Sequence, residues 1–300
     1  MRIGLLLPMA SAAPEGVIEF AQRAEALGAD GLFAFDHLFP PGAPADRPSL
    51  ESTATLGAVA AVTTRVSIGT LVARASLRSA GLLAKHVVAL DDLSDGRFVL
   101  GIGTGDRLSK AEHDAFGLAY LGPEVRRTHL AETVAALRAL LADRPFEGGD
   151  HVPPVAGPVL PRPRTPGGPP IWIGGVSEEA VRVAARGGDG WNGWALDLET
   201  FAARASLLHA ESGGRAVEAT WGGAVVIGDD RDDADRRAAG RRARGIRDDA
   251  FVGDPEAAAE FLSALAEGGA SWAVLLVAGG AERLGLLAER VLPRVSGGPS

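Results

Sequence analysis

The chain has 300 residues, no cysteine and a formal net charge of −8, with 46% hydrophobic and 23% charged residues. These values are typical of a globular protein, and they exclude disulfides, thiolate nucleophiles and cysteine-ligated metal sites. The acidic balance argues against a nucleic-acid partner, and no apolar run is long enough to span a membrane. The first apolar run is also too short for a signal peptide, so we expect a cytoplasmic protein.

Short apolar runs alternate with longer helical patterns along the chain. The predicted strands are Arg2–Leu7, Gly31–Phe35, Val66–Val72, Phe98–Ile102, Ile171–Gly174, Gly190–Trp194, Ala219–Ile227 and Trp272–Val277. The predicted helices are Pro14–Leu27, Ser49–Val62, Ser79–Leu93, Pro123–Leu141, Glu178–Arg186, Leu198–Glu211, Pro255–Glu267 and Arg283–Val291. The segment Asp229–Asp249 is rich in Asp and Arg and is expected to form a solvated helix or loop.

Eight strands, each followed by a helical pattern, predict an α/β fold of the (β/α)8 TIM-barrel type. The stretch 143–170 holds nine of the 19 prolines and interrupts the alternation. We interpret it as a proline-rich insertion in a single domain that spans residues 1–300, with a domain boundary as the alternative. A doubly wound sheet is the alternative fold, and it is disfavoured because no GxGxxG motif follows the first strand.

Polar residues collect where the predicted strands end, which is where barrel enzymes place their active sites. Asp36 and His37 follow the second strand. An imidazole titrates near neutral pH, so His37 could give a proton to a substrate or take one from it. A helix-capping Asp beside a surface His is the alternative interpretation.

Two glycine-rich turns are further candidates. Gly101–Asp106 allows close approach of the backbone to a ligand, although a tight turn explains the glycines equally well. Ile171–Ser177 ends a strand at a helix start, where backbone amides bind phosphate, or where Ser177 simply caps the helix. Gly279–Ala281, after the last strand, is the second candidate for a phosphate site. Trp194 is a candidate for lining a ligand, and no metal-binding motif is present.

Taken together, these residues resemble the luciferase-like monooxygenase superfamily, and within it the branch that uses the deazaflavin coenzyme F420. The resemblance runs from about Arg2 to Val291. The segments that carry it are Asp36-His37, Gly69–Gly105, Pro170–Gly175, Gly187–Asn192 and Val252–Leu262. It implies the barrel fold, hydride transfer at the barrel mouth and a homodimer.

The resemblance also implies roles for individual residues. His37 and Asp106 would be the acid/base groups, Asp106 being one methylene shorter than the usual Glu. A bulge with a non-prolyl cis peptide, at Leu71–Val72 or its neighbour, would support the coenzyme ring. The residues implied to bind the cofactor are Asp36, Leu71, Val72, Ala73, Arg74, Gly103, Thr104, Gly105, Gly174, Gly175, Val176, Ser177, Glu178 and Trp194.

We therefore expect an F420-dependent oxidoreductase that transfers a hydride between coenzyme F420 and a small organic substrate. An FMN-dependent monooxygenase that uses reduced flavin and oxygen is the first alternative, because the barrel and the glycine-rich phosphate site suit both. A non-catalytic flavin- or deazaflavin-binding protein is the second alternative. It is motivated by Asp106 and by Ser79-Ala80, which stands where the family usually has Asn-Pro or His-Pro.

Overall fold

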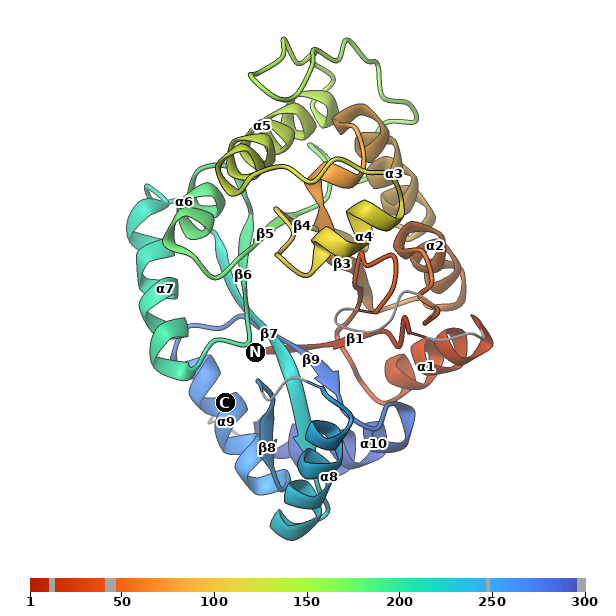
Figure 1. Cartoon of the computed structure of the whole chain (residues 1–300), viewed down its shortest axis with the longest axis vertical. Coiled ribbons are helices and arrows are strands. Elements are labelled where there is room, and N and C mark those ends of the chain that lie inside the picture. Colours follow the sequence, from red (N-terminus) through yellow and green to blue (C-terminus); the bar gives the residue numbers. More distant parts are fainter. Residues whose placement is uncertain (11–13, 41–46, 247–248, 296–300) are drawn as a thin grey trace.

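The structure is a computed structural model that describes residues 1–10, 14–40, 47–246 and 249–295. Its centre is a parallel β-barrel surrounded by helices (Figure 1). The strands are β1 (Arg2–Leu6), β2 (Gly31–Ala34), β3 (Ser67–Arg74), β4 (Phe98–Gly103), β5 (Ile171–Gly174), β6 (Gly190–Trp194), β7 (Glu218–Ile227), β8 (Phe251–Gly253) and β9 (Trp272–Val277). Strands β1 to β7 pair in chain order, and β9 closes the barrel between β7 and β1. The predicted TIM barrel is confirmed.

The short strand β8 was not predicted. It pairs with the carboxyl end of β7, where Val225 to Ile227 face Phe251 to Gly253, and so lies outside the closed barrel. Three residues are too few to produce a periodic hydrophobic signal, which explains why the sequence pattern did not reveal it.

Helices cover the outside of the barrel (Figure 1). They are α1 (Pro14–Ala26), α2 (Ser52–Val62), α3 (Ala80–Leu93), α4 (Ser109–Ala115), α5 (Pro123–Leu141), α6 (Glu178–Gly187), α7 (Leu198–Glu211), α8 (Arg231–Ala243), α9 (Pro255–Glu267), α10 (Ala281–Leu286) and α11 (Leu292–Val295). Ala75–Leu77 forms a 3-10 turn after β3, and Leu287–Val291 is a π-helical segment between α10 and α11. No described helix is both long and apolar enough to cross a membrane.

Side-chain oxygens explain where several helices begin. Asp254, for example, accepts a hydrogen bond from the backbone N–H of Ala257 at 2.9 Å and caps α9. The helix α4 was not predicted. Its seven residues lie between β4 and α5, over the carboxyl ends of the strands (Figure 1).

The proline-rich stretch 143–170 forms an extended excursion between α5 and β5, seen at the top of Figure 1. Two carboxylates tie it to neighbouring helices. Asp91 of α3 accepts hydrogen bonds from both the N–H and the hydroxyl of Thr165 at 2.8 Å, and Glu132 of α5 accepts from the backbone N–H groups of residues 150–152. The predicted insertion is confirmed. That residues 1–300 form one domain stays a prediction.

Val72 organises the mouth of the barrel. The peptide bond Leu71–Val72 is cis, as the resemblance implied, and β3 is irregular between Thr70 and Ala73. Val72 then projects among the glycines of the next two strands. A Cβ atom would lie 2.8 Å from Val72 Cγ2 at Gly103 and 2.6 Å from Val72 Cγ1 at Gly174. The space beside these glycines is therefore used by the protein's own side chain.

Replacing Gly101 with Ala is expected to lower the free energy of unfolding by about 1–3 kcal/mol, the usual effect of overpacking a core. A Cβ atom here would lie 2.2 Å from the backbone carbonyl oxygen of Thr70. Urea denaturation measures the change. Gly240→Ala in α8 is the matched control, since nothing lies within 4 Å of its Cβ position and alanine favours a helix. Equal stability of the two variants would contradict the packing described.

Candidate active site

His37 lies just beyond the carboxyl end of β2, and its side chain is 18% exposed. Its Nδ1 is 2.6 Å from Oε1 of Glu112 on α4, which is 1% exposed. The other carboxylate oxygen of Glu112 accepts from the backbone N–H of Leu38 at 2.6 Å and from Nη2 of Arg74 at 2.8 Å. One buried carboxylate thus holds both the imidazole and the backbone that carries it.

The pKa of Glu112 lies below its ordinary value. Burial by itself raises the pKa, but the hydrogen bond with His37, the hydrogen bond from the Leu38 N–H and the electrostatic attraction of His37 and Arg74 lower it by more. Glu112 is therefore ionised across the neutral range.

Both carboxylate oxygens of Asp36 also accept hydrogen bonds from protein donors. Its Oδ1 accepts from the Ser52 hydroxyl at 2.7 Å and from Nη2 of Arg78 at 3.0 Å. Its Oδ2 accepts from Nη1 of Arg78 at 2.7 Å and from the backbone N–H of Arg74 at 3.0 Å. Four donors fill the acceptor positions of this carboxylate, so we interpret Asp36 as a residue that holds Arg74 and Arg78 in place.

The pKa of Asp36 is also below its ordinary value. Burial raises the pKa, whereas the two hydrogen bonds and the charge of Arg78, with help from the Arg74 N–H and the Ser52 hydroxyl, outweigh that effect. Each buried carboxylate thereby has an arginine as its counter-charge, and Arg78 also pairs with the half-exposed Glu51 at 2.6 Å.

Arg74 retains unused hydrogen-bonding capacity. It is 3% exposed and donates through Nη2 to Glu112. Within the described residues, its Nε and Nη1 are buried and have no hydrogen-bond partner. Buried donors without partners are unusual in folded proteins, and the Arg74 side chain lies beside Gly105, which was predicted to bind the cofactor.

The second predicted acid/base group has different hydrogen-bond partners from the first. Asp106 is exposed, and its Oδ1 accepts from the N–H and hydroxyl of Ser109 at the start of α4, at 2.9 and 3.0 Å. The hydroxyl of Thr104 donates to the carbonyl of Gly105 at 2.9 Å. The described hydrogen bonds join His37 to Glu112 and not to Asp106.

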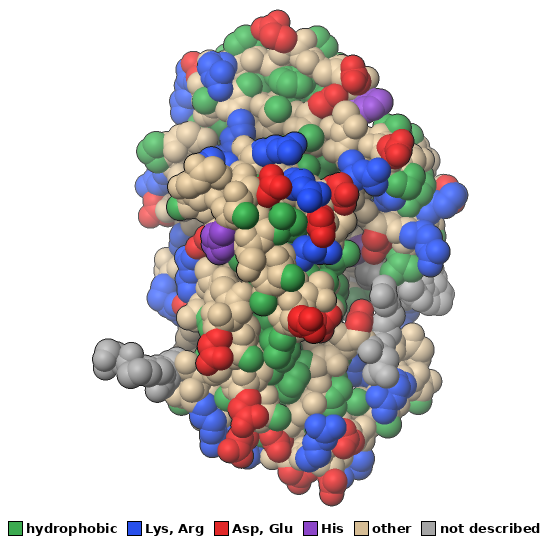
Figure 2. Space-filling view, turned by 90° about the vertical axis from the view of Figure 1, so that its left-hand side faces the viewer, with side chains coloured by type: hydrophobic (Ala, Val, Ile, Leu, Met, Phe, Trp, Pro, Cys, Tyr) green, Lys and Arg blue, Asp and Glu red, His purple; other side chains and the backbone are tan. Residues whose placement is uncertain are grey.

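At the predicted phosphate site, at the start of α6, the polar side chains already have partners within the protein. Ser177 caps the helix by accepting from Ala180, and Glu178 pairs with Arg182 and Arg204. Gly175 is held to β6 through its N–H and carbonyl, and Val176 is exposed. Basic and acidic side chains are likewise interspersed on this side of the molecule (Figure 2).

An aromatic wall lies beside His37. The Phe35 ring makes edge contacts with the His37 imidazole, at 5.9 Å between centroids, and with Trp194, at 5.3 Å. Phe35, Val72 and Trp194 pack partly buried on the inner aromatic layer of the barrel. Phe35 and His37, which follow β2, thus meet the predicted residues Val72 of β3 and Trp194 of β6 at one end of the barrel.

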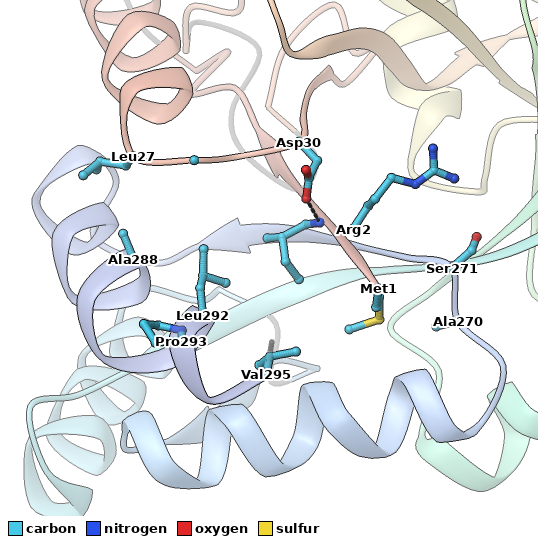
Figure 3. Close-up of a pocket in the computed structure, with 12 residues that line it drawn as sticks. Met1, Arg2, Leu27, Asp30, Ala270, Ser271, Ala288, Leu292, Pro293 and Val295 are labelled. Carbon is cyan, nitrogen blue, oxygen red and sulfur yellow. Dashed lines mark hydrogen bonds between the residues drawn. The ribbon is translucent and has the colours of Figure 1, made fainter. Parts of the chain in front are cut away.

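A cavity of about 810 Å³ lies at the opposite end of the barrel, at the amino ends of β1, β2 and β9 (Figure 3). Asp30 there accepts from the backbone N–H of Ile3 at 2.7 Å, and Arg2 stacks on Trp272. In barrels this end serves stability, and chemistry takes place at the carboxyl ends. We therefore place the candidate active site at His37. No group of described residues gathers the side chains of a metal site.

Sequence reasoning missed Glu112 and Arg78. Glu112 lies 75 residues from His37 in a helix that was not predicted. The only signal in the sequence was the helical spacing of Ser109, Glu112 and His113; the structure adds that all three are buried. Arg78 gave no pattern of its own, since only the fold brings it to Asp36.

The sequence matches the family described as luciferase-like monooxygenase over residues 1–292, so the chain belongs to this family. The predicted membership is confirmed. The F420-dependent glucose-6-phosphate dehydrogenase of Beutenbergia cavernae is 31% identical over 198 residues, which cover 64% of this chain and 56% of that protein. The enzyme of the same name from Nakamurella multipartita is 34% identical over 185 residues, 59% of this chain and 51% of that protein. The chain thus matches little more than half the length of these relatives.

Solved structures show the same fold. An F420-dependent secondary alcohol dehydrogenase in complex with an F420–acetone adduct superposes with a TM-score of 0.84 at 19% identity, over 98% of both chains. The EDTA monooxygenase of Chelativorans sp. BNC1 superposes with a TM-score of 0.82 at 16% identity, over 99% of this chain and 94% of that one. At these identities the likeness establishes the barrel.

Arg78→Met is expected to lower the free energy of unfolding by about 3–5 kcal/mol, because it leaves the Asp36 carboxylate buried without its counter-charge. The ion pair with the half-exposed Glu51 is lost as well, but an exposed pair contributes only about 0–1 kcal/mol. Lys110→Met is the matched control. It breaks an ion pair with Asp114 whose partners are more than half exposed, and such pairs contribute about 0–1 kcal/mol. Urea denaturation of both variants measures the difference. Similar losses would contradict the structural role of the Asp36–Arg78 pair.

Proposed function

We propose that the protein is an oxidoreductase that uses coenzyme F420 as its hydride carrier, with His37 as an acid/base group. The observation that carries the proposal is the pairing of His37 with the buried Glu112 at the carboxyl end of the barrel. Barrel enzymes place proton-transfer groups at this end. The relatives named F420-dependent glucose-6-phosphate dehydrogenase support the choice of coenzyme.

The residues at the mouth fit such a coenzyme. The unpartnered Nε and Nη1 of Arg74 could donate to its polar atoms, and Val72 with Trp194 offers an apolar support for a flat ring. Gly174 to Glu178 at the start of α6 remain our candidates for contacts with its phosphate tail. The coenzyme, when bound, supplies a ring that accepts or releases hydride.

The protein's own groups would then move protons and exclude water. His37 exchanges a proton with the substrate through the ring nitrogen that Glu112 leaves free. Asp106 remains our candidate for the opposing acid/base group, because the hydrogen bonds of its carboxylate with Ser109 use only Oδ1. Phe35 and Trp194 line the site with apolar surface.

We also propose that the protein is a homodimer. Helix α2 contains no charged residue, and the neighbouring α3 exposes Leu82, Ala89 and Leu93 along one face. A helix that is apolar all round is normally covered. Light scattering is expected to give twice the mass of the chain and, for a Leu82→Glu/Leu93→Glu variant, the mass of one chain. A wild-type protein with the mass of a single chain would contradict the dimer.

Fluorescence titration with F420, FMN and FAD tests the cofactor. We expect F420 to bind wild type and His37→Ala with affinities within about threefold of each other. We expect F420 reduction, assayed with a panel of alcohols and with glucose 6-phosphate, to fall about 10²–10⁴-fold in His37→Ala, because a proton-transfer group is lost. His209→Ala, an exposed position on α7, is the control and should retain activity.

Two results would overturn the proposal. Binding of FMN without F420 would favour the flavin-dependent monooxygenase. F420 binding together with no F420-linked turnover of any tested compound by wild type would favour the non-catalytic alternative.

A further inference from the structure

We infer that Glu112 is a positioning residue that fixes a proton on Nδ1 of His37, so that Nε2 is the nitrogen that accepts a proton from the substrate. The catalytic meaning of this inference rests on the proposed oxidoreductase function. The position of the proton is a property of the protein alone and can be measured without coenzyme.

Hydrogen-bond donors surround the Glu112 carboxylate. Its Oε2 already accepts two hydrogen bonds, from the Leu38 N–H and from Nη2 of Arg74. Its Oε1 faces Nδ1 of His37 at 2.6 Å. An ionised carboxylate can only accept hydrogen bonds, so Nδ1 must be the donor in this pair. In a neutral imidazole the proton on Nδ1 leaves the lone pair on Nε2.

The surroundings keep Glu112 ionised and immobile. It is 1% exposed and its nearest cation, Arg74, is 3% exposed, so little water screens their attraction. The backbone of Arg74 is in turn held by Asp36, and Asp36 by the two-point contact with Arg78. The side chain that orients His37 therefore has a fixed charge partner on a fixed backbone.

A single substitution reverses the predicted proton position. In Glu112→Gln the amide oxygen should take the place of Oε2, because that place faces two donors, Leu38 N–H and Arg74 Nη2. The amide NH₂ must then take the place of Oε1 and donate to Nδ1 of His37. With Nδ1 an acceptor, the proton of the neutral imidazole moves to Nε2.

The test uses coenzyme-free protein labelled with ¹⁵N-histidine, at a pH where the imidazole is neutral. Long-range ¹H–¹⁵N correlation distinguishes protonated from unprotonated ring nitrogens, and His37→Asn assigns the signals by their loss. We expect the proton on Nδ1 in wild type and on Nε2 in Glu112→Gln, so the two nitrogen shifts exchange. Glu132→Gln is the matched control. The wild-type carboxylate of Glu132 accepts from the backbone N–H groups of residues 150–152 and no described hydrogen bond joins it to His37, so this variant should leave the His37 signals unchanged.

A merely structural role for Glu112 would not exchange the two nitrogens. If the proton is on Nε2 in the wild-type protein, the inference is wrong. This measurement needs no variant, so the inference can be tested even if Glu112→Gln does not fold. A folded Glu112→Gln that keeps the proton on Nδ1 overturns it as well. F420 titration of the same samples reports on the proposed function separately. Failure to bind F420 with the proton on Nδ1 rejects the function and leaves the inference standing.

Discussion

The site depends on the compensation of two buried carboxylates by the buried Arg74 and the partly buried Arg78. Glu112 is paired with Arg74, and Asp36 with Arg78, at the carboxyl end of the barrel. Removing such charges from water is costly, and the cost is offset only where every oxygen has a donor. Here Ser52 and backbone N–H groups complete the set. His37 is held at the rim of this network, and its orientation follows from the network as a whole.

The barrel geometry brings these groups together. Asp36 follows β2, Arg74 is the last residue of β3, and Arg78 follows the turn after β3, so neighbouring parallel strands deliver them to one edge. Glu112 is contributed by α4, which lies over the carboxyl ends of the strands. The Val72 side chain fills the space beside the glycines of β4 and β5. It thereby forms a packed apolar surface next to the charged network. The glycines that sequence reasoning assigned to ligand approach are thus also required by packing within the protein.

Local patterns predicted the regular elements well. The bounds of Leu198–Glu211, Pro255–Glu267 and Trp272–Val277 agree with the structure, because caps and periodicity are properties of short segments. Asp36 and His37 could be predicted for the same reason, as polar residues that follow an apolar strand. The side chains that pair with these two residues, Arg78 and Glu112, could not be predicted, because pairing across 42 and 75 residues is decided by tertiary structure. Asp106 was chosen from its place after the glycines of β4, whereas the carboxylate that reaches His37 lies six residues later.

The ionisation of the two buried carboxylates is the central claim of this account. Titration of the side-chain carboxyl carbons of Asp36 and Glu112 by ¹³C NMR measures it most directly. Their depressed pKa values mean that both groups stay ionised as the pH falls through the ordinary values of 3.8 and 4.5 and gain protons only below them. The stability they contribute is therefore present above those values and is lost as the pH falls through the lower pKa values of the folded protein. Protonation of either carboxyl group above its ordinary value would contradict the account.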